Sequence, residues 1–237
     1  MSSVYRPVAE SETSPVAQTQ RHSVVLEPYV DTRGWIQNAS FHLKRVAALE
    51  KGAIDGPKAV VLHRTQSSTI ESPLKSFESG VGTHFIIDKD GTVHQCASLL
   101  MRTAHVGRIR SRCHESNSCP VEEARMIKSW GWAPAWIHDH EKSKTYPHRY
   151  PMNEDSVGIE TVASFDGTSW ERPTPAQEKS IKALIQLLQR LYGLTDSDVH
   201  EHDNISYKTA GEGGGLYSPS SAYGLPPLVQ PRFPFPT

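Results

Sequence analysis

The sequence predicts an α/β fold, and three observations carry this prediction. Residues 59–65, AVVLHRT, form a β-branched run that suits a buried strand. Residues 83–96 contain two β-rich runs joined at Asp-Lys-Asp-Gly, where Gly91 can adopt the positive φ of a tight hairpin. A third strand is predicted over residues 156–164, and a long amphipathic helix follows it. Strands flanked by such helices are typical of α/β proteins.

The helix has recognisable signals at both ends. Thr174 is placed to cap its first turn, Pro175 suits the first helical position, and Gln177 would complete a capping box. Gly193 is a stop signal. The apolar positions recur at helical spacing and predict a face packed on the sheet: Ile181, Leu184, Ile185, Leu188 and Leu191.

Length and composition predict one folded domain with irregular ends. A chain of 237 residues, 37% hydrophobic and 22% charged, can bury one sizeable core. Residues 1–22 are rich in Ser, Thr, Pro and Glu, which predicts a flexible arm. Residues 218–237 are dense in proline, which predicts a tail without helix or central strand. The folded domain is therefore expected over residues 23–217.

Charge and hydropathy argue against several classes of partner. The net charge of -1 gives no electrostatic reason to expect nucleic acid or an anionic membrane surface. No apolar run approaches the roughly 20 residues that span a bilayer, so membrane insertion is not expected. The N-terminal residues lack the basic start and apolar stretch of a secretion signal, which predicts a protein that is cytoplasmic as made.

Three cysteines are too few for a disulfide scaffold. Their number favours free thiols at Cys113 and Cys119, with a local disulfide as the alternative in an oxidising compartment. Cys96 follows a strand and is predicted to lie in the core.

Polar residues in and after these elements suggest a site. His63 ends the first strand, Glu160 lies within the third, and His202 follows the helix. A carboxylate between apolar strand residues is costly to bury without a partner. Taken singly, each residue has a structural alternative: a hydrogen-bonded histidine at a strand end, or a glutamate on the solvent face of an edge strand.

Five motifs in one order give a family resemblance: VVLHRT, THFIIDKDGTVHQ, AHVG, NEDSVGIE and HDNISYK. Over roughly residues 59–215 the chain resembles the zinc-dependent N-acetylmuramoyl-L-alanine amidases, the family of the phage amidase lysozymes and the animal peptidoglycan recognition proteins. The resemblance implies a central mixed β-sheet flanked by α-helices, and a shallow groove that holds one Zn2+ ion.

The resemblance also implies a set of zinc ligands. His63 and His202 match the two family histidines. The third ligand is usually an Asp or Cys two residues after a lysine, but two residues after Lys208 this chain has Ala210. We therefore predict Glu212 as the third ligand, because neighbouring glycines let the backbone bend. Asp203 and His200 are the alternatives.

The same comparison implies catalytic roles for two residues. Glu160 would take a proton from the zinc-activated water and pass it to the leaving amine. Lys208 would stabilise the oxyanion. Contact with substrate is predicted for His105 at the rim of the groove and for Thr83, His84, Arg149 and Asn153.

An insert of roughly residues 108–152 separates two of the motifs and holds three tryptophans, Trp130, Trp132 and Trp136. The first interpretation is a surface subdomain whose tryptophans fill its own core. The alternative is an extended groove wall, with aromatic faces for sugar rings and Arg149 or Lys144 for the carboxylates of a stem peptide. A second metal site at the histidines of residues 138–140 is disfavoured, because no ligand cluster supports it.

The predicted function is hydrolysis of the amide bond between N-acetylmuramic acid and L-alanine in peptidoglycan or a muropeptide. Ala210 keeps a second function open, a non-catalytic module that binds peptidoglycan. The pattern looks most like bacterial amidases delivered as antibacterial effectors, which implies non-classical secretion, action in the periplasm of a target cell and an immunity protein in the producer. Cytoplasmic muropeptide recycling is the alternative location.

Overall fold

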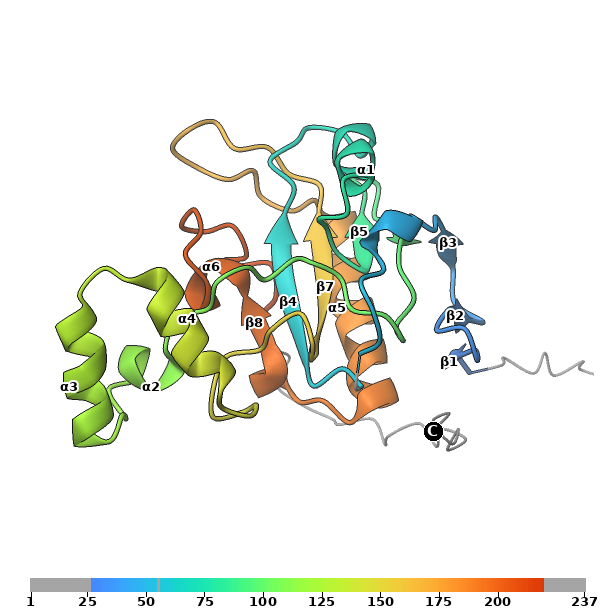
Figure 1. Cartoon of the computed structure of the whole chain (residues 1–237). Helices are drawn as coiled ribbons and strands as arrows, with labels where there is room; N and C mark the ends of the chain where they lie inside the picture. Colours follow the sequence, from blue (N-terminus) through green and yellow to red (C-terminus); the bar gives the residue numbers. More distant parts are fainter. Residues whose placement is uncertain (1–26, 55, 220–237) are drawn as a thin grey trace, which may run out of the picture.

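The computed structural model describes residues 27–54 and 56–219 (Figure 1). The predicted arm, residues 1–22, lies outside the described residues, as does the predicted tail from residue 220 onward. Within the described part of the chain, no helix is both long and apolar enough to cross a bilayer.

A six-stranded mixed sheet forms the centre of the fold, in the order β3-β6-β5-β7-β4-β8. Only β5 and β6 pair antiparallel, and all other neighbours in this sheet run parallel. This arrangement confirms the predicted α/β class with a mixed sheet. The strands are β3 (Phe41–Leu43), β4 (Ala59–Arg64), β5 (Phe85–Ile87), β6 (Val93–Gln95), β7 (Ser156–Thr161) and β8 (Val199–Glu201).

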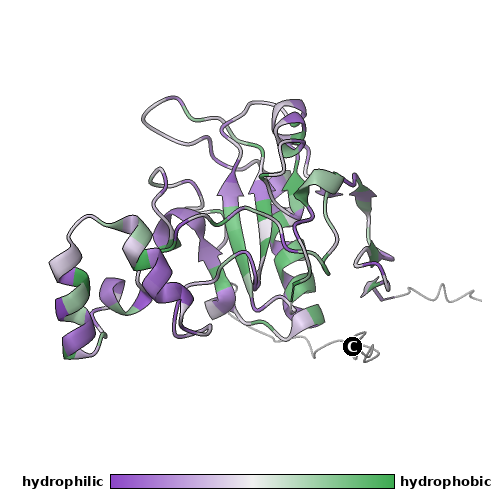
Figure 2. Cartoon of the chain, in the orientation of Figure 1, coloured by the Kyte–Doolittle hydropathy of each residue, from purple (hydrophilic) through white to green (hydrophobic). Residues whose placement is uncertain are grey.

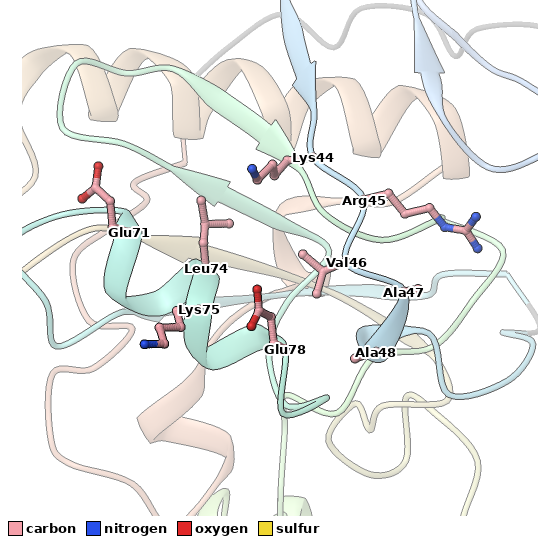
Figure 3. Close-up of a pocket in the computed structure, with 9 residues that line it drawn as sticks. All are labelled: Lys44, Arg45, Val46, Ala47, Ala48, Glu71, Leu74, Lys75 and Glu78. Atoms are coloured by element: carbon pink, nitrogen blue, oxygen red, sulfur yellow. The ribbon is translucent and has the colours of Figure 1, made fainter.

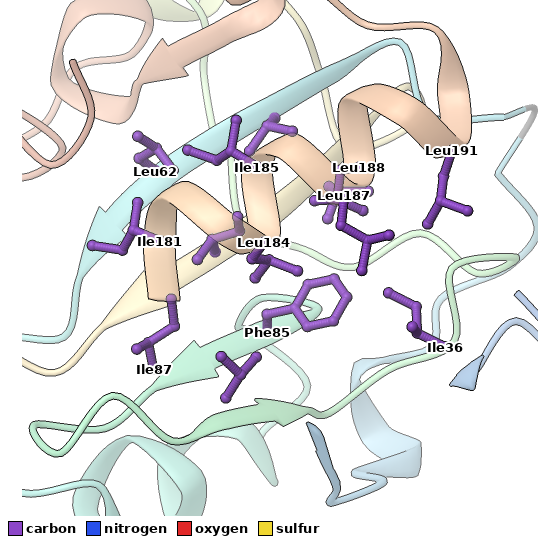
Figure 4. Packing of buried hydrophobic residues seen from close by; sticks show 14 of the residues in the cluster. Ile36, Leu62, Phe85, Ile87, Ile181, Leu184, Ile185, Leu187, Leu188 and Leu191 are labelled. Carbon is purple, nitrogen blue, oxygen red and sulfur yellow. The ribbon is translucent and has the colours of Figure 1, made fainter. Parts of the chain in front are cut away.

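Helix α5 (Pro175–Tyr192) covers one face of the sheet. Its predicted end signals are confirmed: Thr174 and Gln177 form a capping box, and Gly193 ends the helix with a φ of +68°. The predicted apolar face packs against β4, β5 and β7, as Figure 4 shows for Leu62, Phe85 and Ile87. Each fully buried aliphatic side chain contributes about 1.5–3 kcal/mol, so this layer fixes the strands beneath the site.

Strand alternation sends the other side chains of β4 and β7 to the opposite face. There Val61 packs with Val106, Ile109, Met152 and Ile205 in a smaller apolar cluster. The segment that carries Val106 crosses in front of β4 and β7 in Figure 1. This second face carries the predicted site.

The hairpin and the smaller elements complete the domain. Gly91 takes a φ of +86° between β5 and β6, as predicted, and Cys96 is buried as expected. No sequence signal predicts the paired strands β1 (Tyr29–Val30) and β2 (Ile36–Gln37). The remaining short helices are η1 (Ala47–Leu49), α1 (Glu71–Phe77), η2 (Asp196–Asp198) and α6 (His202–Ile205).

The insert folds as three helices beside α6: α2 (Arg112–Glu115), α3 (Val121–Trp130) and α4 (Pro134–Lys142). Cys113 and Cys119 form a disulfide that joins α2 to the segment before α3, so the prediction of two free thiols is wrong. Cysteine count says nothing about distance, and the turn between these helices brings the two sulfurs together.

The tryptophans of the insert do not fill a common core. Trp132 and Trp136 are 82% and 61% exposed, which contradicts the first interpretation of the insert. Charged groups hold the helices together instead, since Lys144 donates to the carboxylates of both Glu123 and Glu141.

Candidate functional site

The site begins where β4 and β7 end. These strands pair in parallel with His63 opposite Glu160, so both side chains lie on the same face of the sheet. Figure 2 shows the consequence: both strands are apolar along most of their length and hydrophilic at their carboxyl ends. The polar residues of these two buried strands thus lie together at their carboxyl ends.

His202 and Glu212 reach the same place from the end of the domain. β8 pairs with β4, and α6 begins directly after it, so the ring centroid of His202 lies 4.1 Å from that of His63. Glu212 Oε1 lies 2.7 Å from His202 Nδ1 and 3.7 Å from His63 Nδ1. The ligand atoms of these three residues all lie within 4.8 Å of one another, as a shared metal ion requires.

Hydrogen bonds behind His63 determine which of its nitrogens is free. The Ser156 hydroxyl donates to the carbonyl of Met152 at 2.6 Å, so its oxygen accepts from His105 Nε2 at 3.3 Å. The other nitrogen of His105 then accepts from His63 Nε2 at 3.1 Å. This series of hydrogen bonds leaves the Nδ1 lone pair of His63 directed toward Glu212.

His202 is oriented in a similar way. Its Nε2 lies 2.8 Å from the carbonyl of Val106 and donates to it, which directs Nδ1 at Glu212. Histidines that bind metals usually donate their second ring N–H to such an acceptor. Two imidazole nitrogens that face one carboxylate form a group suited to a cation.

Burial and mutual contacts set the charges of these groups. Burial, together with the nearby His202, lowers the pKa of His63 to about 3, so its imidazole is neutral. Burial disfavours the Glu212 carboxylate, but its contacts with the two histidines hold its pKa well below the usual range. Burial and the charge of Glu212 raise the pKa of Glu160 to about 8, while Lys208 opposes this shift.

The loop that carries Glu212 is held by residues outside the ligand set. Asp203 accepts the backbone N–H groups of Gly211 at 2.7 Å and Gly213 at 2.8 Å, on both sides of Glu212. The Arg64 guanidinium donates to the carbonyls of Gly211 at 2.6 Å and Gly214 at 2.8 Å. These contacts fix an otherwise pliable glycine-rich segment.

Two more features shape this loop. The indole of Trp170 donates to the carbonyl of Ala210 at 3.0 Å. Gly213 passes so close to the backbone of His202 and Leu62 that a Cβ atom would lie 2.5 Å from each. No sequence motif predicts these roles of Arg64 and Trp170, because both side chains bind backbone carbonyls far away in sequence.

The two alternative third ligands lie outside the group. Asp203 is occupied by the loop backbone, and His200 contacts the hydroxyl of Tyr146 at 3.3 Å. The geometry therefore favours Glu212 over both. Lys208 follows α6 with an exposed side chain, and its charge acts on Glu160 and His63.

Several residues predicted to contact substrate lie behind the site instead. His105 is 7% exposed and bonded to His63 and Ser156, because Gly158 leaves room for its ring. Thr83 and His84 are completely buried beneath the same strand. These placements do not support the predicted contact with substrate, because all three side chains pack against neighbours inside the protein.

Asn153 and Arg149 also make internal contacts. Asn153 Oδ1 accepts the backbone N–H groups of His105 and Val106 at 3.0 and 2.9 Å, and so fixes the segment behind His63. Arg149 is buried and pairs with Asp155 at 2.7 Å. Neither arrangement supports the predicted contact with substrate, and both residues instead stabilise the structure around the site.

A separate hollow lies between α1 and the segment 44–48 (Figure 3). It has a volume of about 720 Å³ and is lined by charges of both signs, among them Lys44, Glu71, Lys75 and Glu78. It contains none of the clustered histidines and glutamates, so we do not assign the chemistry to it.

Comparison with known proteins identifies the family. The sequence pattern of the N-acetylmuramoyl-L-alanine amidase family matches residues 54–214, which is more than half of the chain. The chain belongs to this family. No curated protein matches the amidase chain at a significant level.

Solved structures of low sequence identity resemble this amidase. A selenomethionine derivative of AmpD is 17% identical, with a TM-score of 0.49, and the match covers 80% of this chain and 94% of that chain. The endolysin amidase LysCS from Clostridium intestinale URNW is 19% identical, with a TM-score of 0.42 and coverages of 72% and 88%. PlyL is 14% identical, with a TM-score of 0.45 and coverages of 72% and 85%.

Proposed function

We propose that this amidase hydrolyses the bond between N-acetylmuramic acid and L-alanine in peptidoglycan, with a zinc ion held by His63, His202 and Glu212. The observation that carries the proposal is the convergence of two Nδ1 atoms and one carboxylate within 4.8 Å, beside Glu160 on the neighbouring strand. Family membership supports the reaction class.

The three residues suit zinc by their chemistry. Two imidazoles and one carboxylate are a known ligand set for a catalytic zinc, which keeps a further position open. When bound, zinc supplies a water molecule whose pKa is lowered from about 15.7 to about 7. The contacts of His63 with His105, and of His202 with the Val106 carbonyl, hold both imidazoles in the orientation that such a site needs.

Glu160 and Lys208 perform the proton transfer and the charge stabilisation. Glu160 takes a proton from the attacking water and returns it to the leaving amine of L-alanine. Burial raises its pKa to about 8, while a cation at the neighbouring ligands acts in the opposite direction and favours the ionised base. Lys208, exposed after α6, stabilises the negative charge on the carbonyl oxygen.

The test is digestion of purified sacculi by the wild type, Glu160→Gln and Glu122→Gln, with and without a chelator. Glu122 lies on α3 with an exposed carboxylate and serves as the matched control. We expect stem peptides that begin with L-alanine from the wild type and the control only, and none after chelation. Release of the same peptides by chelated enzyme would contradict a metal-dependent reaction.

One observation favours a second function, a module that binds peptidoglycan without cleaving it. Ala210 stands where the resemblance places the usual third ligand. A recognition module would bind sacculi but release no peptide from them. In such a module, Glu212→Gln would leave zinc binding unchanged. The amidase would lose zinc affinity in that variant.

We further propose that the protein acts in an oxidising compartment, as an antibacterial protein delivered to the periplasm of a rival cell whose producer carries an immunity protein. The disulfide between Cys113 and Cys119 supports this location, because such bonds persist mainly outside the reducing cytoplasm. Expression with a periplasmic signal should lyse a susceptible bacterium, whereas Glu160→Gln should not. Equal toxicity of cytoplasmic and periplasmic forms would contradict the proposal.

A further inference from the structure

Trp132 is an exposed aromatic residue that the structure brings close to the site. It lies in the connection between α3 and α4 and is 82% exposed. Its ring packs edge to face against Tyr207, with the centroids 5.2 Å apart and the planes at 80°. An edge-to-face contact with one neighbour leaves at least one face of the indole open to solvent.

Tyr207 connects this aromatic pair to the catalytic groups. It immediately precedes Lys208, the residue to which we assign oxyanion stabilisation. Figure 1 shows the α3–α4 connection at the same end of the molecule as the loop after α6. The insert therefore extends the surface beside the metal ligands.

Contacts on the other side of Tyr207 hold the pair in place. The Arg110 guanidinium lies over the Tyr207 ring at 4.9 Å from its centroid, and Arg110 Nε donates to the carbonyl of Ser206 at 3.0 Å. A β-bridge between Ile109 and Ser206 ties the start of the insert to the end of α6. Trp132 thus packs against a residue that is itself held by Arg110.

We propose that Trp132 stacks on a sugar ring of the glycan strand, next to the N-acetylmuramic acid that carries the scissile amide. The proposal rests on the proposed function. A sugar ring offers a face of C–H groups to an aromatic surface and keeps its hydroxyls in water. Trp132 contacts Tyr207, and Tyr207 is followed directly by Lys208, so we place the stacked ring next to the reacting sugar. The enzyme should therefore prefer polymer over small fragments.

The test compares kcat/KM on polymeric glycan strands with kcat/KM on N-acetylmuramoyl-tripeptide, a substrate with a single sugar. Trp132→Ala should lower the ratio of polymer to fragment about tenfold, through KM on the polymer. Trp132→Tyr, which keeps an aromatic face, should restore most of the ratio. Trp136→Ala is the control, because Trp136 is also exposed in the insert but packs against Trp130 on α3.

The outcomes separate this inference from the proposed function. If the wild type cleaves neither substrate, the proposed function fails. If it cleaves both and Trp132→Ala changes the two kcat/KM values by the same factor, the ratio of polymer to fragment is unchanged. That result would overturn the proposal that Trp132 stacks on a sugar ring and would leave the proposed amidase function intact. The exposed indole would then be a surface for a protein partner.

Discussion

A substitution of Asp203 tests whether the loop that carries Glu212 must be held in place for metal binding. The two carboxylate oxygens of Asp203 accept the backbone N–H groups of Gly211 and Gly213, one on each side of the ligand. Asp203→Asn keeps one acceptor oxygen and turns an NH2 group toward the second backbone N–H. The change leaves all three proposed ligand side chains intact.

The size of the effect follows from those two bonds. A hydrogen bond to a charged group contributes about 1.5–3 kcal/mol, and Asn loses one of the two. If this free energy holds Glu212 in place, zinc binding should weaken roughly tenfold to hundredfold, since about 1.4 kcal/mol is a factor of ten. Losses of the same size are typical when outer contacts of metal ligands are removed.

The assay is a competition titration with a chromophoric zinc chelator, which measures affinity independently of catalysis. Asp31→Asn is the matched control: Asp31 also accepts two backbone N–H groups, from Arg33 and Trp35, but lies at the β1–β2 turn on the other side of the molecule. If both variants bind zinc as tightly as the wild type, the proposed role of Asp203 is refuted.

Three further predictions concern the framework. Gly213→Ala should abolish zinc binding and lower Tm, because the new Cβ would lie 2.5 Å from two backbone atoms. Gly214→Ala is the control and should have a much smaller effect on both quantities, because its Cβ would meet nothing closer than 3.2 Å. Replacing both Cys113 and Cys119 with serine should lower the free energy of unfolding by about 2 kcal/mol, as a short closed loop predicts; a reductant should destabilise the wild type equally in a denaturant titration. Leu188→Ala, in the buried face of α5, should cost about 2–5 kcal/mol in the same titration.

The sequence predicted those elements whose signals are local. The capping box and stop glycine of α5, the glycine turn between β5 and β6, and the apolar run of β4 all involve neighbours along the chain. Local chemistry determines such elements, so their bounds could be stated from the sequence. The short strands β1 and β2, at two residues each, carry no periodic pattern that could predict them.

Contacts between distant residues explain the errors. The rim position predicted for His105 differs from the structure, because the absence of a side chain at Gly158 lets its ring pack inside. Trp132 and Trp136 were expected to be buried, since large aromatic residues usually are. The insert is held by Glu123, Glu141 and Lys144 instead, and no sequence period predicts such a charged cluster.

The proposed third ligand, Glu212, bears on the choice between an enzyme and a recognition module. Ala210 has no ligand atom, yet the chain turns back within two residues and brings Glu212 to the same histidines. This turn requires a backbone without a side chain at Gly213 and a cation, Arg64, to gather the exposed carbonyls. A protein that had only lost a ligand would have no need of this support. The position of Glu212 beside the two histidines, the contacts that hold its loop, and the presence of Glu160 therefore support our proposal of hydrolysis over binding alone.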